Sequence, residues 1–435
     1  MTRFNRYRLS IWAALSLLVV ALVAEFGTTS VGVAADLEGE VEAAHLRFLQ
    51  EDQCYICHLD EDYLPEDFLL DDTHMQAGLS CSGCHGGNPT SDDEDVSMSV
   101  AAGFVGVPSR AEMPEFCGRC HSSIEFMRQF QPRITTDQVD QYYTSIHGIK
   151  LRDGDGKVAT CANCHSAHGI LPASDARSSV YASNVPATCK KCHSDSDYMA
   201  GYNIGTNQYE KYAKSVHGVA LLENEDTGSP ACNDCHGNHG ATPPGVGSLA
   251  KVCGECHVNN MEYFEASAMA EPFEEHDLVA CEACHGNHEV RPTFDGMVGI
   301  GDDSVCLNCH EKGDMGYAVA DTIRLHLAEL TTIYDATVVK QEDVQHKGMD
   351  DVEIEFLLQE ANQSLIQART LVHTFDPQKV GLKTAEGVKK ADEAMVLAEE
   401  SIKDHFIRRR GLGFATLFIT LLVVALILKI RQLDH

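Results

Sequence analysis

One five-residue pattern, Cys-x-x-Cys-His, dominates this sequence of 435 residues. It occurs nine times between Cys54 and His310, which leaves fewer than 30 residues of chain for each motif, too few for a conventional aliphatic core. The nine motifs use all 18 cysteines, in the pairs Cys54 and Cys57, Cys81 and Cys84, Cys117 and Cys120, Cys161 and Cys164, Cys189 and Cys192, Cys232 and Cys235, Cys253 and Cys256, Cys281 and Cys284, and Cys306 and Cys309. The histidines that complete them are His58, His85, His121, His165, His193, His236, His257, His285 and His310.

The histidine of the motif distinguishes haem attachment from zinc binding and from a redox disulfide. A single Cys-x-x-Cys is typical of half a zinc knuckle or of a redox disulfide. Neither reading explains why a histidine follows the second cysteine in all nine copies. Two thioether bonds to the vinyl groups of a haem, with the histidine bound to the iron, account for all three side chains. The sequence therefore predicts nine covalently bound haem c groups, whose stacked porphyrins supply most of the core.

The motifs belong to a tandem repeat that also contains histidines outside them. Each copy has a leading histidine, a motif, a histidine three residues beyond it, and a second motif. A degenerate copy precedes the three complete ones and has Asn88 where the second histidine is expected, and the motif at Cys54 stands alone at the front. The repeat supplies seven natural sixth ligands for iron: His74, His147, His168, His217, His239, His276 and His288.

On these motifs the chain resembles periplasmic multihaem c-type cytochromes, and more narrowly the cytochrome c3-like and octahaem-type proteins with a His-Gly…Cys-x-x-Cys-His-x-x-His repeat. The resemblance covers residues 45 to 310 strongly and the rest only in outline. It implies export, because haem is attached to such proteins outside the cytoplasm. The sequence has no Cys-x-x-Cys-Lys motif, which is the hallmark of the pentahaem nitrite reductases.

Beyond His310 the cysteines stop, and apolar residues recur with the period of an α-helix. The pattern predicts three antiparallel helices in residues 314–410. Because nine irons need up to nine distal ligands and the repeat supplies seven, His45, His326 and His373 are further candidates. We expect them to serve the first three haems, where the repeat is degenerate. The alternative for each is an ordinary structural or exposed histidine.

The two ends of the chain each carry an apolar run. Residues 1–35 read as a signal peptide, because their run of 14 apolar residues is shorter than the roughly 20 that a retained anchor needs. Residues 411–428 contain no charge and predict a transmembrane helix, since no other apolar surface is available to bury them. The expected order is 1–35 signal peptide, 36–313 nonahaem domain, 314–410 three-helix unit, 411–430 transmembrane helix and 431–435 cytoplasmic tail. The fold class is mostly α with extensive loops.

Charge and ligand count together narrow the function. The net charge is −32 over the whole chain, which argues against a nucleic-acid partner and favours redox partners with a basic face. Iron bound by two histidines has no place for a substrate. We therefore expect a periplasmic electron carrier on the inner membrane, between a quinol-oxidising membrane partner and periplasmic or outer-membrane acceptors. One alternative is an oxidoreductase acting on a small nitrogen or sulfur compound at a five-coordinate haem, and another is the electron-entry subunit of a fixed respiratory complex.

Overall fold

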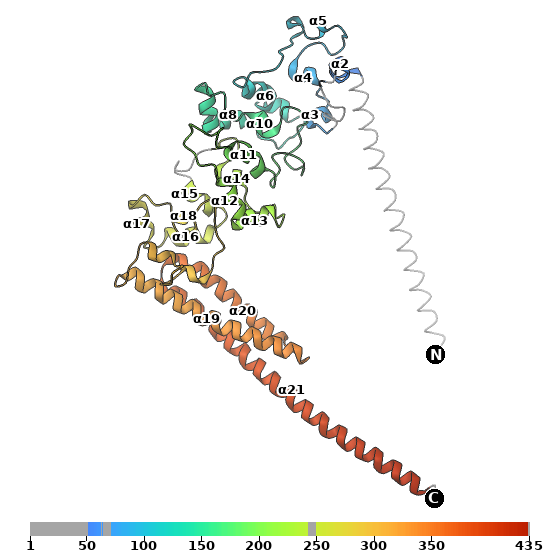
Figure 1. Cartoon of the computed structure of the whole chain (residues 1–435), viewed down its shortest axis with the longest axis vertical. Helices are drawn as coiled ribbons and strands as arrows, with labels where there is room; N and C mark the ends of the chain where they lie inside the picture. Colours follow the sequence, from blue (N-terminus) through green and yellow to red (C-terminus); the bar gives the residue numbers. More distant parts are fainter. Residues whose placement is uncertain (1–50, 62, 64–70, 242–248, 434–435) are drawn as a thin grey trace. The chain divides into compact units, whose positions relative to one another are not determined.

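The computed structural model describes residues 51–61, 63, 71–241 and 249–433, which form helices joined by loops, with no strand among them (Figure 1). The expected class, mostly α with extensive loops, is confirmed. The proposed signal peptide and His45 lie outside the described residues.

Short helices carry the motif region. Up to His193 they are α2 (Gln53–Asp60), α3 (Thr73–Gln76), α4 (Cys81–His85), α5 (Glu94–Ser97), η1 (Val100–Ala102), α6 (Met113–His121), α7 (Ile124–Met127), α8 (Gln138–Thr144), α9 (Ile146–Arg152), α10 (Cys161–His165) and α11 (Val185–His193). They continue as α12 (Gln208–Lys214), α13 (Val216–Leu222), α14 (Cys232–His236), α15 (Leu249–Val252), η2 (Cys253–Glu255), α16 (Val258–Glu265), α17 (Ala270–Glu275), α18 (Ala280–His285), η3 (Asp295–Met297) and η4 (Val305–Asn308).

The described chain forms two compact units. The first comprises Met1–Tyr209 and Ala220–Pro243, and the second comprises Glu210–Val219 and Pro244–His435, counting only their described residues. The sequence predicts a boundary near residue 313, whereas the last three motifs share a unit with the long helices that follow them. This grouping has a physical cause, because α16 packs on α20 (Val352–Leu371), and η3 and η4 pack on α19 (Met315–His346).

Three long helices end the chain: α19, α20 and α21 (Pro377–Leu433). Their core consists of two apolar clusters, one around Leu327, Leu330 and Leu365, and the other around Val344, Ile354 and Ala394. Ala391, Ala394 and Ala398 of α21 are all fully buried. Such small side chains let α21 lie close to both of its neighbours, as expected for tightly packed helices.

Helix α21 runs for 57 residues without a break and continues past α19 and α20 (Figure 1). The sequence analysis places a domain boundary at Gly411, but the helix passes straight through it, since one glycine costs a helix only about 1 kcal/mol. Its most apolar 18-residue window has a mean hydropathy of 2.6, and none of that window is buried within the molecule. The helix is therefore long and apolar enough to cross a membrane.

Candidate haem sites

The local fold of the motifs brings their two cysteines together. Four of the motifs form or end one-turn helices, as in α4, α10, α14 and α18, and two more end the longer helices α6 and α11. Residues three apart lie on the same side of a helix, so the two thiols of each motif share a face. None of the 18 cysteines forms a disulfide. Each pair can therefore form two thioether bonds to one porphyrin.

Six motif histidines face a histidine from outside the motifs. The ring centroids are 5.9 Å apart for His74 and His121, 6.1 Å for His85 and His168, 6.1 Å for His147 and His193, 6.0 Å for His165 and His239, 6.3 Å for His217 and His257, and 6.1 Å for His285 and His373. An iron bound at about 2 Å from one nitrogen of each ring holds two imidazole centroids about 6 Å apart. The spacing of these pairs therefore fits haem iron with two axial histidines.

The pairs follow a regular order along the chain. A leading histidine faces the second motif of its own copy, as His147 faces His193. His168 and His239 each lie three residues beyond a first motif, and each faces the first motif of the preceding copy, at His85 and His165 respectively. His373, in the short turn η5 (Val372–Thr374), faces His285, which completes the first motif of the last copy. Neighbouring copies are thereby interleaved.

A Ser-x-His-Gly sequence fixes two of the leading histidines at the start of short helices. The hydroxyl of Ser145 accepts a hydrogen bond from the backbone N–H of Gly148 at 3.0 Å, and Ser215 does the same for Gly218 at 3.0 Å. A Cβ atom on Gly148 would overlap the carbonyl oxygen of Tyr142. The serine is thus the N-cap and the glycine is required by close approach of the backbone, so that His147 has a fixed position.

Hydrogen bonds donated by Nδ1–H orient several rings. Nδ1 lies 2.8 Å from the Gly106 carbonyl oxygen in His85 and 2.9 Å from that of Thr370 in His373. In His74 and His310 the neighbour is a carboxylate, that of Asp72 at 3.4 Å and that of Asp314 at 3.3 Å. An acceptor at Nδ1 fixes the proton there and leaves Nε2 for a metal. The sequence analysis overlooked both aspartates, whose signal is an acidic N-cap beside a histidine.

Burial favours the neutral imidazole, which is the form that binds iron. Desolvation is the largest cause that lowers the pKa of His147 and of His193, and the next is a nearby imidazole, that of His193 for His147 and that of His236 for His193. Burial acts to raise the pKa of Asp72, but hydrogen bonds from His74, Ile170 and Met75 outweigh it and lower this pKa to about 2. At neutral pH the imidazoles of His147 and His193 are therefore neutral, and the carboxylate of Asp72 is ionised.

Consecutive motifs adjoin one another within each unit. The side chains of Cys117 and Cys161, of Cys189 and Cys232, and of Cys253 and Cys281 are close neighbours. In each case the second motif of one copy meets the first motif of the next. Thiols from the two motifs within a copy are also close enough to interact, as Cys164 is with Cys189. The motifs thus form continuous rows.

The remaining candidate histidines have other surroundings. His58 contacts the ring of Tyr63, with centroids 5.6 Å apart. His276 is exposed at the end of α17, and the structure gives neither it nor His310 an imidazole partner among the described residues. His326 lines a groove of about 790 Å³ among the three long helices and abuts Gly381. His236 and His288 each have a polar, ring or electrostatic contact, so neither is without a partner.

Two expectations need correction. His373 and His326 were expected beside the first three haems, yet His373 lies beside His285 of the eighth motif and His326 faces α21. Helical periodicity shows that a histidine borders an apolar stripe, but it does not show what packs against that stripe. The contact between α16 and η5 brings His373 to the later motifs.

Comparisons with known families agree with this geometry. A family model described as cytochrome c3 matches residues 73–194 and 225–311, and one described as cytochrome c554 and c-prime matches residues 30–86. No significant match was found among curated proteins or among solved structures. The matched families bind haem c covalently and transfer electrons, in keeping with the motifs and the paired imidazoles. This chain is a multihaem c-type cytochrome.

Proposed function

We propose that this cytochrome is an electron conduit with nine haem c groups, anchored by its C-terminal helix on the periplasmic side of the inner membrane. The observation that supports it most is the set of six facing imidazole pairs, each joining a motif to a histidine elsewhere. Iron with two such ligands is saturated and exchanges electrons without binding substrate. The continuous rows of motifs provide short steps between one site and the next.

In this proposal the paired histidines are the axial ligands. Haem supplies reversible one-electron chemistry, and the chain sets where each group sits and how its ligands are oriented. The Nδ1 acceptors of His85 and His373 hold those rings in place, and partial burial of the imidazoles limits access of water.

The C-terminal half supports membrane attachment. Helix α21 has its core positions up to Ala398 packed against α19 and α20, and its apolar segment follows directly in the same helix. Arg408, Arg409 and Arg410 stand at the start of that segment, where basic side chains can meet anionic lipid head groups. A quinol-oxidising membrane protein is the proposed donor, and the acidic surface favours acceptors with a basic docking face.

Two kinds of measurement test this proposal: the haem content and spin state of the purified protein, and the reduction of electron acceptors in cells. Intact mass of the mature, detergent-purified protein should show nine added haems, and its electron paramagnetic resonance spectrum should be mainly low-spin. In the native host, deleting the gene should leave periplasmic acceptors oxidised when the quinol pool is reduced. Reduction of those acceptors at the normal rate in the deletion strain would show that this chain is not their donor.

A second candidate, an oxidoreductase for a small nitrogen or sulfur compound, rests on the ninth motif. Among the residues that the structure describes, His310 contacts Asp314 and the first turn of α19 and faces no imidazole, and His276 is exposed. An iron at this motif with one open position would bind carbon monoxide when reduced and would turn over nitrite or hydroxylamine. Carbon monoxide difference spectra and substrate consumption by the reduced protein test it, and a lack of turnover removes this candidate.

A further inference from the structure

Asp72 is a nearly buried carboxylate, 4% exposed, at the start of α3. Its Oδ1 accepts hydrogen bonds from the backbone N–H of His74 at 2.8 Å and of Met75 at 3.3 Å, and lies 3.4 Å from Nδ1 of His74. Its Oδ2 accepts from the backbone N–H of Ile170 at 2.8 Å. The carboxylate therefore uses its two oxygens on two separate parts of the chain.

Those two parts present the partners of two different motifs. His74 faces His121 of the third motif, and Ile170 follows two residues after His168, which faces His85 of the second motif. A backbone hydrogen bond of 2.8 Å from Thr73 to the Ile170 carbonyl closes the same junction. The second and third motifs are themselves neighbours, since the thiol of Cys84 interacts with that of Cys120.

We propose that Asp72 is a positioning residue shared by two adjacent haems, which orients and polarises His74 and also fixes the loop that carries His168. The inference deepens the proposed function and rests on its axial assignments. A carboxylate at Nδ1 makes an imidazole a stronger donor to iron, which favours the ferric state and lowers the reduction potential. The haem of His74 and His121 is therefore held at a lower potential than it would have with a neutral acceptor.

Comparison with the other copies of the repeat separates this role from simple helix capping. The position two residues before the leading histidine is a serine in two copies, Ser145 and Ser215, and those serines cap their helices with a single hydroxyl. Serine and aspartate are similarly effective N-caps. A cap alone thus does not require a charge or a second oxygen, and Asp72 supplies both. The histidines after Ser145 and Ser215 receive no carboxylate from this position.

The test uses the full-length holoprotein in detergent and the variant Asp72→Ser, which installs the residue found in the sister copies. We follow a redox titration by visible spectra. At a given potential, one haem in nine should have a ratio of reduced to oxidised form about tenfold higher than in the wild type, an effect of the size seen when other partners of a metal-binding histidine are removed. A tenfold change in this ratio corresponds to a rise of about 59 mV in the reduction potential of a one-electron couple. The variant His74→Ala, which makes that haem high-spin, identifies its component. The low-spin signal of the haem facing His168 should broaden as well.

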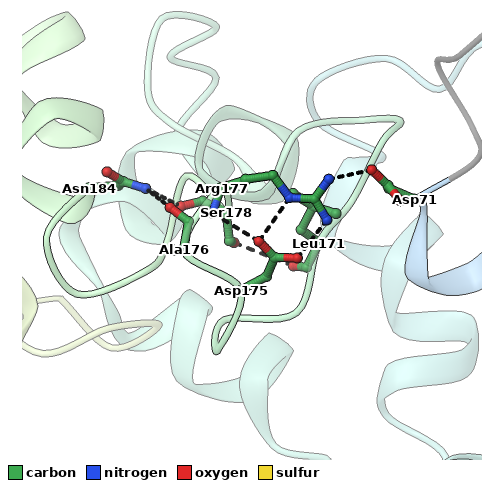
Figure 2. Close-up of polar contacts among 7 residues, drawn as sticks. All are labelled: Asp71, Leu171, Asp175, Ala176, Arg177, Ser178 and Asn184. Atoms are coloured by element: carbon green, nitrogen blue, oxygen red, sulfur yellow. Dashed lines mark hydrogen bonds and ion pairs between the residues drawn. The ribbon is translucent and has the colours of Figure 1, made fainter. Parts of the chain in front are cut away.

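The neighbouring residue provides a matched control. Asp71 is exposed and pairs with Arg177, which Asp175 also holds through two hydrogen bonds of 2.8 and 3.1 Å (Figure 2). The variant Asp71→Asn removes the same charge one residue away without touching an imidazole. It should leave every potential within the error of the titration.

The possible outcomes distinguish failure of the inference about Asp72 from failure of the proposed function on which it rests. Equal titrations for Asp72→Ser and Asp71→Asn would show that Asp72 is a cap only. If Asp72→Ser attaches haem poorly, Asp72→Asn keeps an acceptor oxygen at Oδ1 and loses only the charge, so an unchanged potential in that variant would refute the inference equally well. A wild-type protein without low-spin signals from two axial histidines would instead refute the axial assignments of the proposed function.

Discussion

His373 offers the sharpest test of how the haem array ends. It lies in the turn η5, outside the repeat, with its ring 6.1 Å from that of His285 and tilted from it by only 24°. The variant His373→Ala removes this ring and leaves the motif intact. We expect the haem bound by Cys281, Cys284 and His285 to lose its sixth ligand, while the other haems keep theirs.

The size of the effect follows from the structure. With one haem at each of the nine motifs, as proposed, one iron in nine becomes high-spin, which is about 11% of the haem. The ring also donates one hydrogen bond from Nδ1, at 2.9 Å to the Thr370 carbonyl oxygen, and the loss of this bond costs about 0.5–1.5 kcal/mol. The helix core contains none of its atoms, because that core is formed by residues such as Leu327, Leu330 and Leu365. The protein should therefore remain folded and fully loaded with haem.

The assay is electron paramagnetic resonance of the oxidised protein, with a carbon monoxide difference spectrum of the reduced protein. One equivalent of carbon monoxide should bind in addition to any bound by the wild type, and added imidazole should restore the low-spin signal by entering the vacated space. His326→Ala is the matched control, since His326 belongs to the same unit but faces Gly381 and no motif. It should change neither spectrum.

Two results would refute this reasoning. If His373→Ala keeps every iron low-spin, another ligand serves the eighth motif and the facing rings are incidental. If His326→Ala gives the same high-spin fraction, the effect comes from disturbing the helices and not from a lost iron ligand.

Further predictions concern the anchor, a leading histidine and the helix core. Truncation before Gly411 should release a soluble haem protein, as cell fractionation will show; a truncated chain that still sediments with membranes would contradict a sole anchor in α21. Gly148→Ala should displace His147, cost about 1–3 kcal/mol and raise the high-spin fraction by one haem, whereas Gly156→Ala, which meets nothing within 4 Å, should do neither. Ala391→Leu, at a fully buried site beside Thr337, should lower the unfolding temperature measured by circular dichroism without altering the haem spectra, while an equal loss from the exposed Val396→Leu would argue against the packing described.

The sequence predicted the long helices well because the spacing of their apolar residues shows which side chains are buried. Ile323, Leu327 and Leu330 recur on one face of α19, and all three are almost fully buried. The nine motifs were equally plain, since covalent chemistry demands three side chains at fixed spacing. The continuity of α21 was harder to predict, because a change of composition near Gly411 marks where the surroundings change but does not require the helix to end.

The partners of the histidines could not be predicted from spacing. His168 lies three residues from its nearest motif, yet it faces His85 of the preceding copy, and only the path of the intervening loops decides this. His276 did carry a signal in the sequence: Glu274 replaces the capping serine and Asp277 replaces the glycine of the Ser-x-His-Gly pattern. Those two changes remove the cap and the close backbone approach that fix His147, and His276 is correspondingly exposed.

Interleaving explains why this array needs a helical domain at its C-terminal end. The first motifs at His85 and His165 take their facing histidines, His168 and His239, from the copy that follows, and the last copy has no successor to supply one. Repeat proteins commonly meet such a need with an atypical terminal element. Here the turn after α20 does so: Phe375 adopts a left-handed conformation with φ 51°, which ends the helix and leaves His373 beside His285. The element that completes the array is thus covalently continuous with α21, so the last interleaved haem site and the apolar helix are fixed in one packed unit.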